Sequence, residues 1–206
     1  GRAIKSKLWS PNRVDKIEES INAIFWIMKD NTIPPIMKIN DPVLASALGS
    51  TLATKRSSAE RLAKGVDPNA LVFEPYANPF RTYKLVNDYE AFKKLFAESN
   101  VDCYIMNTGD FMGKDITKEI TLGSLEAIVE GKAEFADTGL PGIQNFPIEG
   151  YELDFSNIEF KKQFKARMHD RVAFIKEREI VREGYDKLPL EALKAMMAVA
   201  EKAGEL

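Results

Sequence analysis

The stretch VDCYIMNTGDFMGKDITKEITLGSLEAIVEG, residues 101–131, decides the fold. Its apolar start, from Val101 to Met106, predicts a core strand, because continuous apolarity is typical of a strand covered on both faces. Residues 107–113 include two glycines and predict a turn. The apolar positions between Ile116 and Val129 predict a helix, and Gly131 at the following C′ position predicts its end. Strand, turn and helix in this order are typical of an α/β protein.

The flanking sequence supplies further elements of both kinds. The apolar run from Ala23 to Met28 predicts a second strand covered on both faces. Asp41 before Pro42 predicts the start of a helix that runs to Leu52. Asn87 or Asp88 is expected to cap a further helix that runs through Phe96. After residue 150 two helices are expected, the first ending at Gly184. Their apolar positions recur at helical spacing, at Phe160, Phe164, Met168 and Val172 in the first and Leu190, Leu193, Met197 and Ala200 in the second.

Composition excludes several functional classes. The formal net charge of the 206 residues is −2, and lysines and arginines alternate with acidic residues, so a nucleic-acid surface is not expected. No apolar run approaches the ~20 residues of a membrane span. One cysteine and one histidine are too few for a zinc site within the chain. Cys103 lies in the predicted core strand and is expected to be an inert thiol, and a single cysteine fits a cytoplasmic protein. The basic stretch Lys161–Arg171, with His169, is expected to form a solvated helix face.

The turn before the predicted helix at 116–129 invites comparison with a phosphate-binding loop. Helix N-termini bind phosphates through free N–H groups, and Gly109, Gly113 and Lys114 are residue types that such loops use. However, a phosphate loop needs four residues between its glycines and Ser or Thr after the lysine, whereas here three residues intervene and Asp115 follows. The competing interpretation is a plain strand-to-helix turn in which Thr117 or Asp115 caps the helix.

A longer comparison gives a family resemblance. Tyr-Ile-Met-Asn-Thr-Gly at 104–109 resembles the Tyr-Leu-Val-Asn-Thr-Gly strand end of the ATP-dependent phosphoenolpyruvate carboxykinases. Residues 113–117, Gly-Lys-Asp-Ile-Thr, are similar to that family's Gly-Lys-Arg-Ile-Ser, after a shortened loop. Upstream, residues 22–35 resemble its Val-Ile-Phe-Leu-Thr strand and Leu-Pro-Pro turn. Residues 50–55 are similar to the segment before its Thr-Ala-Lys-Val-Ala-Gly-Thr-Glu lid, and Glu60 matches the closing Glu of that lid. Residues 78–80 resemble its Ala-Pro-Phe segment.

The resemblance implies a fold and a set of site residues. The expected fold is the mixed-sheet C-terminal lobe of this family at 22–150, after a connecting arm at 1–21 and before a helical extension at 151–206. The implied nucleotide site comprises Lys114, Asp115, Ile116 and Thr121, of which Ile116 would contact the base and Thr121 would supply a hydroxyl. The implied lid contains Lys55, Arg56 and Glu60, and closure of a lid excludes water from a catalytic site. Arg2 is the expected phosphate ligand, and no metal ligand is expected within the chain.

These residues imply part of an enzyme. The parent protein would use ATP with Mg²⁺ or Mn²⁺, and its phosphate loop and metal ligands would precede Gly1 in an N-terminal lobe. Phosphoryl transfer depends on such groups, so we expect no turnover from this chain alone. The severed lobe would also expose apolar surface and self-associate. The alternative is a carboxykinase-like binding or interaction module without catalysis, which Asp115 and the shortened turn favour, since the family has Arg at the position of Asp115.

Overall fold

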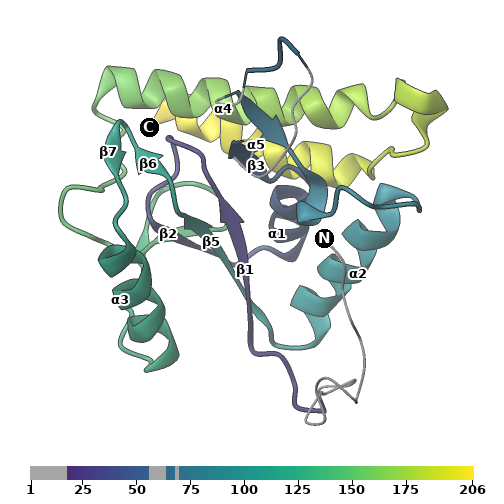
Figure 1. Ribbon diagram of the computed structural model, residues 1–206. Coiled ribbons are helices and arrows are strands. Elements are labelled where there is room, and N and C mark those ends of the chain that lie inside the picture. The colour runs from purple at the N-terminus through teal and green to yellow at the C-terminus, as the bar shows by residue number, and fades with distance from the viewer. Residues whose placement is uncertain (1–17, 56–63, 68–69) are drawn as a thin grey trace.

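The computed structural model describes residues 18–55, 64–67 and 70–206 as an α/β protein (Figure 1). Five α-helices occur in this part of the chain: α1 Pro42–Ser50, α2 Leu85–Glu98, α3 Lys118–Val129, α4 Ile158–Glu177 and α5 Leu190–Glu205. Two short 3₁₀ helices are η1 Pro75–Ala77 and η2 Val181–Gly184. The strands are β1 Ala23–Met28, β2 Ile36–Ile39, β3 Ala53–Lys55, β4 Leu71–Phe73, β5 Asp102–Asn107, β6 Asp110–Phe111, β7 Lys114–Asp115, β8 Ala136–Asp137 and β9 Ile143–Asn145.

A mixed five-stranded sheet forms the centre of the molecule. Its strand order is β1-β5-β2-β9-β8, in which β1 and β5 are parallel and the other neighbours are antiparallel. The register pairs Ala23 with Asp102 and Met28 with Asn107, so the carboxyl ends of β1 and β5 lie at the same edge. The mixed sheet expected from the sequence is therefore confirmed. Two separate two-stranded sheets, β3-β4 and β6-β7, lie beyond this edge.

One face of the sheet is covered by four helices, and we call it the four-helix face. Trp26, Met28, Cys103 and Ile105 point toward this face because side chains alternate along each strand. They join one hydrophobic core with buried residues of α1, α2, α4 and α5. Figure 1 shows α4 and α5 side by side across the top of this assembly, with α1 and α2 beneath them. The helices at 151–206 thus share a core with the sheet.

The opposite face, which we call the α3 face, is covered more thinly. Ile36, Tyr104 and Met106 are its buried residues, and the partly buried Leu125 and Ile128 of α3 pack against them. Phe25 of β1 stacks on Tyr104 with ring centroids 4.9 Å apart. Figure 1 shows α3 standing apart from the other four helices. Next to it β1 forms an edge of the sheet, and on the same face Ile27 is 59% exposed.

Most predicted elements are present, and two boundaries differ. Helix α1 begins after an Asp41 cap and α3 is followed by Gly131 in the left-handed conformation, as predicted. Helix α2 begins at Leu85, before the expected caps at Asn87 or Asp88. Helix α4 ends at Glu177 rather than Gly184, and it cannot extend to Gly184 because Arg182 and Glu183 both have positive φ. Of the helices described, none has the length and apolarity needed to cross a bilayer.

Candidate functional site

The site is built at the carboxyl ends of β1 and β5, where two turns are tied together by Asn107. This side chain is fully buried, and the two N–H donors of its Nδ2 are shared among the carbonyl oxygens of Asp30, Ile33 and Asp110 at 2.6–2.8 Å. Its Oδ1 accepts from the Gly109 N–H at 3.0 Å. Side-chain amides satisfy backbone groups that turns leave without partners. Asn107 therefore fixes the turn after β5 against the turn after β1.

A tight hairpin occupies the position where the resemblance implies a shortened phosphate turn. Strands β6 and β7 pair Phe111 with Lys114, and Met112 and Gly113 form the two-residue connection. Both residues have positive φ, 49° and 83°, which is the conformation of the type I′ hairpin turn. After the hairpin, Ile116 N–H donates to Gly109 O at 2.9 Å and closes the loop. A preformed backbone loop thus leads into α3.

A groove lies beside the start of α3. It has a volume of about 430 Å³ and is lined by Thr108, Ile116, Lys118, Thr121 and Leu122. Its walls combine two apolar side chains with two hydroxyls and one ammonium group. Ligand sites of small molecules are usually mainly apolar concavities with a few polar groups. Two residues of the implied nucleotide site, Ile116 and Thr121, are therefore neighbours in one groove.

The N-terminus of α3 is capped by the protein itself. Thr117 Oγ1 accepts from the Ile120 N–H at 3.4 Å, and Thr121 donates its hydroxyl to Thr117 O at 3.2 Å. The prediction that Thr117 or Asp115 caps this helix is confirmed for Thr117. A capped first turn offers fewer free N–H groups to a phosphate. The groove accordingly offers a ligand its side chains and the Thr121 oxygen lone pairs rather than free N–H groups.

Lys114 and Asp115 are directed toward a different segment. Lys114 Nζ lies 4.2 Å from the centroid of the Tyr151 ring and donates to Gly150 O at 3.3 Å. Tyr151 donates its hydroxyl to Asp115 O at 2.6 Å. A cation over an aromatic face is held by the ring quadrupole. Of the four implied nucleotide residues, Lys114 and Asp115 lie on the hairpin and contact the Gly150–Tyr151 segment. The other two, Ile116 and Thr121, line the groove.

The implied lid is described only at its first residue. Lys55 ends β3, is exposed, and pairs with Asp110 through Nζ and Oδ1 at 3.4 Å. This contact joins the start of the expected lid to the hairpin beyond β5. Arg56 and Glu60 of the lid, and the phosphate ligand Arg2, lie outside the described residues.

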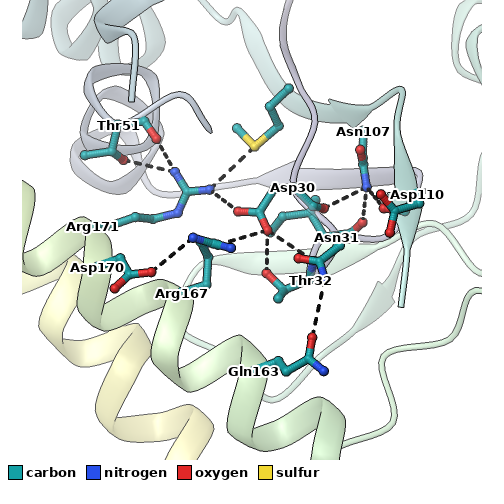
Figure 2. A network of polar contacts seen from close by, with 12 residues as sticks. Asp30, Asn31, Thr32, Thr51, Asn107, Asp110, Gln163, Arg167, Asp170 and Arg171 are labelled. Carbon is teal, nitrogen blue, oxygen red and sulfur yellow. Dashed lines mark hydrogen bonds and ion pairs between the residues drawn. The ribbon is translucent and has the colours of Figure 1, made fainter. Parts of the chain in front are cut away.

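A buried ionic network fixes the turn after β1 (Figure 2). Asp30 is fully buried and accepts from Arg171 Nη2 at 2.8 Å, from Arg167 Nε at 3.3 Å and from Thr32. Arg171 also donates to the carbonyl oxygen of Thr51, at the end of α1. Burial lowers the pKa of Arg171, and the Asp30 carboxylate opposes this shift. The network therefore clamps α4, α1 and the end of β1 together.

The position of Arg171 corrects one sequence prediction. The stretch Lys161–Arg171 was expected to be a solvated face, yet Arg171 is fully buried, while His169 is exposed as predicted. The reason is helical geometry, since residue 171 follows Phe164 by seven positions and Met168 by three and so shares their face. The spacing of residue 171 from Phe164 and Met168 could therefore have indicated from the sequence that Arg171 is buried. The partner Asp30 could not be identified, because 141 residues separate the two in sequence.

Cys103 is a buried free thiol, as predicted. Burial raises its pKa well above the ordinary value for a thiol, so little thiolate is present at neutral pH. Within the described residues no cluster of three or more His, Cys, Asp or Glu side chains is arranged to hold a metal ion.

A second hollow lies on the other side of β1. It has a volume of about 450 Å³, and its walls include Ile27, Thr54, Lys55, Val72 and Phe80. Phe80 is 87% exposed. Ile27, on the edge strand, is therefore bordered by this hollow.

Comparison with other proteins gives no further guide, since neither a family model nor a curated protein matches the chain.

Proposed function

We propose that this chain is the nucleotide-binding lobe of a phosphoenolpyruvate carboxykinase-like protein, and that the groove beside α3 takes the purine base and ribose of ATP. The observation that carries the proposal is the meeting of Ile116 and Thr121 in one groove of about 430 Å³. These are the residues for which the resemblance implies a base contact and a hydroxyl. The volume lies within the range of about 300–1,000 Å³ that is usual for small-molecule sites.

The groove residues fit one end of the nucleotide. Ile116 and Leu122 offer apolar contact to a purine ring, and Thr108 and Thr121 offer hydroxyl groups to ribose. They do not fit a metal-bound triphosphate, since Asp115 adds negative charge on the neighbouring hairpin and Lys114 is held over Tyr151. We therefore assign base and ribose recognition to this chain. The metal, Mg²⁺ or Mn²⁺, and the catalytic groups are expected from an N-terminal lobe of the parent.

The assignment is tested by blocking the groove without disturbing the core. Leu122 lines the groove and is 62% exposed, so Leu122→Glu introduces a carboxylate there at little cost in stability. Val129, seven residues later on the same helix, is 81% exposed and does not line the groove. Val129→Glu is thus a matched control with the same change in charge.

We expect adenosine to shift the amide resonances of Thr108, Ile116 and Thr121 in NMR spectra of the chain. Leu122→Glu should weaken adenosine binding about tenfold or more, because a carboxylate is introduced into an apolar wall. Val129→Glu should leave adenosine binding unchanged. The absence of shifts at millimolar adenosine, or equal effects of the two variants, would refute the groove assignment.

A second function is favoured by the contacts of Lys114 and Asp115. Because both residues are engaged by the Gly150–Tyr151 segment, the chain also fits a carboxykinase-like binding module that has lost catalysis. The two functions differ in the parent protein: a carboxykinase would convert oxaloacetate and ATP to phosphoenolpyruvate, CO2 and ADP, and a binding module would not. For the isolated chain both predict no turnover, and measurable oxaloacetate decarboxylation by this chain alone would contradict both.

A further inference from the structure

The exposed lysine that follows β1 lies at the same edge of the sheet as Thr108, which lines the groove. Lys29 comes directly after Met28, the last residue of β1, and its N–H donates to Ala53 O at 2.9 Å. Thr108, a groove residue, donates its own N–H to Met28 O at 3.0 Å. Lys29 and Thr108 are therefore at corresponding positions beyond two parallel strands. Ligands of α/β sheets bind outside the carboxyl ends of parallel strands.

The two residues also lie on the same face of the sheet. Phe25 and Ile27 belong to the α3 face, and strand alternation continues this side through Lys29. Gly109 permits the close approach, since a Cβ at this position would come within 3.3 Å of Lys29 Cβ. The base of the Lys29 side chain thus lies against the turn that begins with Thr108.

Charge pairing distinguishes Lys29 from the other lysines around this edge. Lys55 pairs with Asp110, Lys118 pairs with Glu119 at 3.8 Å, and Lys114 is held by Tyr151 and Gly150 O. Lys29 is exposed and makes no ion pair within the part of the chain that the structure describes. An unpaired ammonium group is free to meet the charge of an anion.

The base of Lys29 is rigid although its side chain is exposed. The next residue, Asp30, is buried in the ionic network with Arg167 and Arg171 (Figure 2), and its carbonyl accepts from Asn107. Adjacent residues therefore point to opposite sides, with Asp30 anchored among helices and Lys29 on the open α3 face. Because the backbone at Lys29 is already fixed, less conformational entropy is lost when its side chain binds a ligand.

We propose that Lys29 is a phosphate-binding residue, which receives the phosphate chain of a nucleotide whose base and ribose occupy the groove at Ile116 and Thr121. Lys55 is the second cation of this site, weakened by Asp110. The inference rests on the proposed function for the placement of the base, but the phosphate site itself can be probed separately. The chemistry recognised is a di- or triphosphate, attached to a nucleoside or free.

The experiment compares adenosine, ADP and inorganic pyrophosphate by isothermal titration calorimetry on the whole chain. ADP should bind more tightly than adenosine, and Lys29→Gln should reduce ADP and pyrophosphate affinity about tenfold while leaving adenosine unchanged. Lys94→Gln is the control, because Lys94 is 71% exposed on α2 and pairs only weakly with Glu98 at 3.8 Å.

Asp110→Asn gives a change of opposite sign. Asparagine keeps an oxygen that can accept from Gly113 N–H, as Asp110 does at 3.2 Å, but removes the charge that neutralises Lys55. Pyrophosphate and ADP should therefore bind several-fold more tightly to Asp110→Asn, with less gain at high salt. A purely structural role of Lys29 and Asp110 would not produce opposite effects on anions and none on adenosine.

The outcomes separate the two proposals. If adenosine binds but ADP binds no tighter, or if Lys29→Gln leaves the ratio of ADP to adenosine affinity unchanged, the phosphate site is refuted and the groove assignment stands. If adenosine does not bind, the groove assignment fails. Pyrophosphate then decides alone: binding that Lys29→Gln weakens supports the phosphate site, and its absence refutes it.

Discussion

The four-helix face of the sheet buries side chains from four helices, whereas the α3 face has three buried residues and one covering helix among the residues described. The same strands supply both faces, so the contrast comes from what packs on each. On the four-helix side even charged groups are enclosed, as Asp30 and Arg171 show. On the α3 side Ile27, Lys29 and Leu122 are exposed, and Leu122 lines the groove. Buried packing is thus concentrated on one face, and the groove with its exposed side chains lies on the other.

The largest expected effect comes from breaking the ionic network of the four-helix face. Asp30→Ala removes the carboxylate that both Arg167 and Arg171 contact, and leaves a fully buried guanidinium without its counter-charge. We expect a loss of about 3–5 kcal/mol in the free energy of unfolding, measured by urea denaturation. Asp170→Ala removes the exposed partner of Arg167 and should cost less than about 1 kcal/mol. Equal losses of stability in Asp30→Ala and Asp170→Ala would contradict the role of Asp30 in holding the helices to the end of β1.

Truncating aromatic residues tests the two faces directly. Phe164 of α4 is fully buried on the four-helix face, and Phe164→Ala should cost about 3–4 kcal/mol. Phe25 is partly buried on the α3 face and stacks on Tyr104, so Phe25→Ala should cost less than half as much. Chemical denaturation of both variants measures the difference. If Phe25→Ala proved the more damaging change, the α3 face would carry more stability than its contacts indicate.

Asp186 links α2 to the segment before α5 and makes stability depend on pH. Arg81 donates to its carboxylate at 2.6 Å and the Leu85 N–H at 3.2 Å, and the bond from Arg81 is the main reason that the pKa of Asp186 is lowered. A carboxyl group with a lowered pKa in the folded state stabilises it above the unfolded value of about 4, and this contribution disappears as the pH falls through the folded value.

Asp186→Asn should therefore cost about 1.5–3 kcal/mol at pH 7, and the difference from the unmodified chain should shrink as the pH falls below about 4. Urea denaturation at a series of pH values measures this. A difference that stays constant down to pH 2 would show that ionisation of Asp186 contributes nothing.

The smallest expected change in stability concerns the exposed edge of the α3 face. Strand β1 has no strand partner on its outer side among the described residues, and Ile27 is 59% exposed beside the hollow that Phe80 borders. Apolar edge strands favour association between chains. Ile27→Lys should change the free energy of unfolding by less than about 0.5 kcal/mol.

Sedimentation velocity should show that the unmodified chain self-associates and that Ile27→Lys does not. Ile158→Lys, at an 84% exposed position that begins α4, is the control and should associate as before. A monomeric unmodified chain at high concentration would contradict the expected self-association.

Much of the local structure could be predicted from short-range patterns. Continuous apolar runs indicated β1 and β5, Asp41 and Pro42 indicated the start of α1, and Gly131 indicated the end of α3. These features depend on residues a few positions apart, whose backbone preferences and hydrogen bonds are local. The predicted end of α4 at Gly184 was wrong. Arg182 and Glu183 have positive φ, which these residue types rarely adopt, so their identities did not indicate the interruption.

The candidate site could be predicted only in part. The resemblance brought Ile116 and Thr121 to attention, and both line the groove. It also pointed to Lys114, whose contacts with Gly150 and Tyr151 depend on a segment that begins 36 residues away. No local pattern pointed to Lys29, because its position beside Thr108 depends on the parallel pairing of β1 with β5. Residues 29–101 separate these two strands in the sequence.

The sequence by itself determined the α/β character, the caps of α1 and α3 and the inert core thiol, since each follows from local propensity or from burial of apolar residues. Only the tertiary structure decided that Arg171 is buried against Asp30, that Asn107 joins two turns, and that Lys29 and Thr108 share one edge. These contacts join residues far apart in the chain. Their geometry depends on strand order and helix packing, which local sequence patterns do not encode.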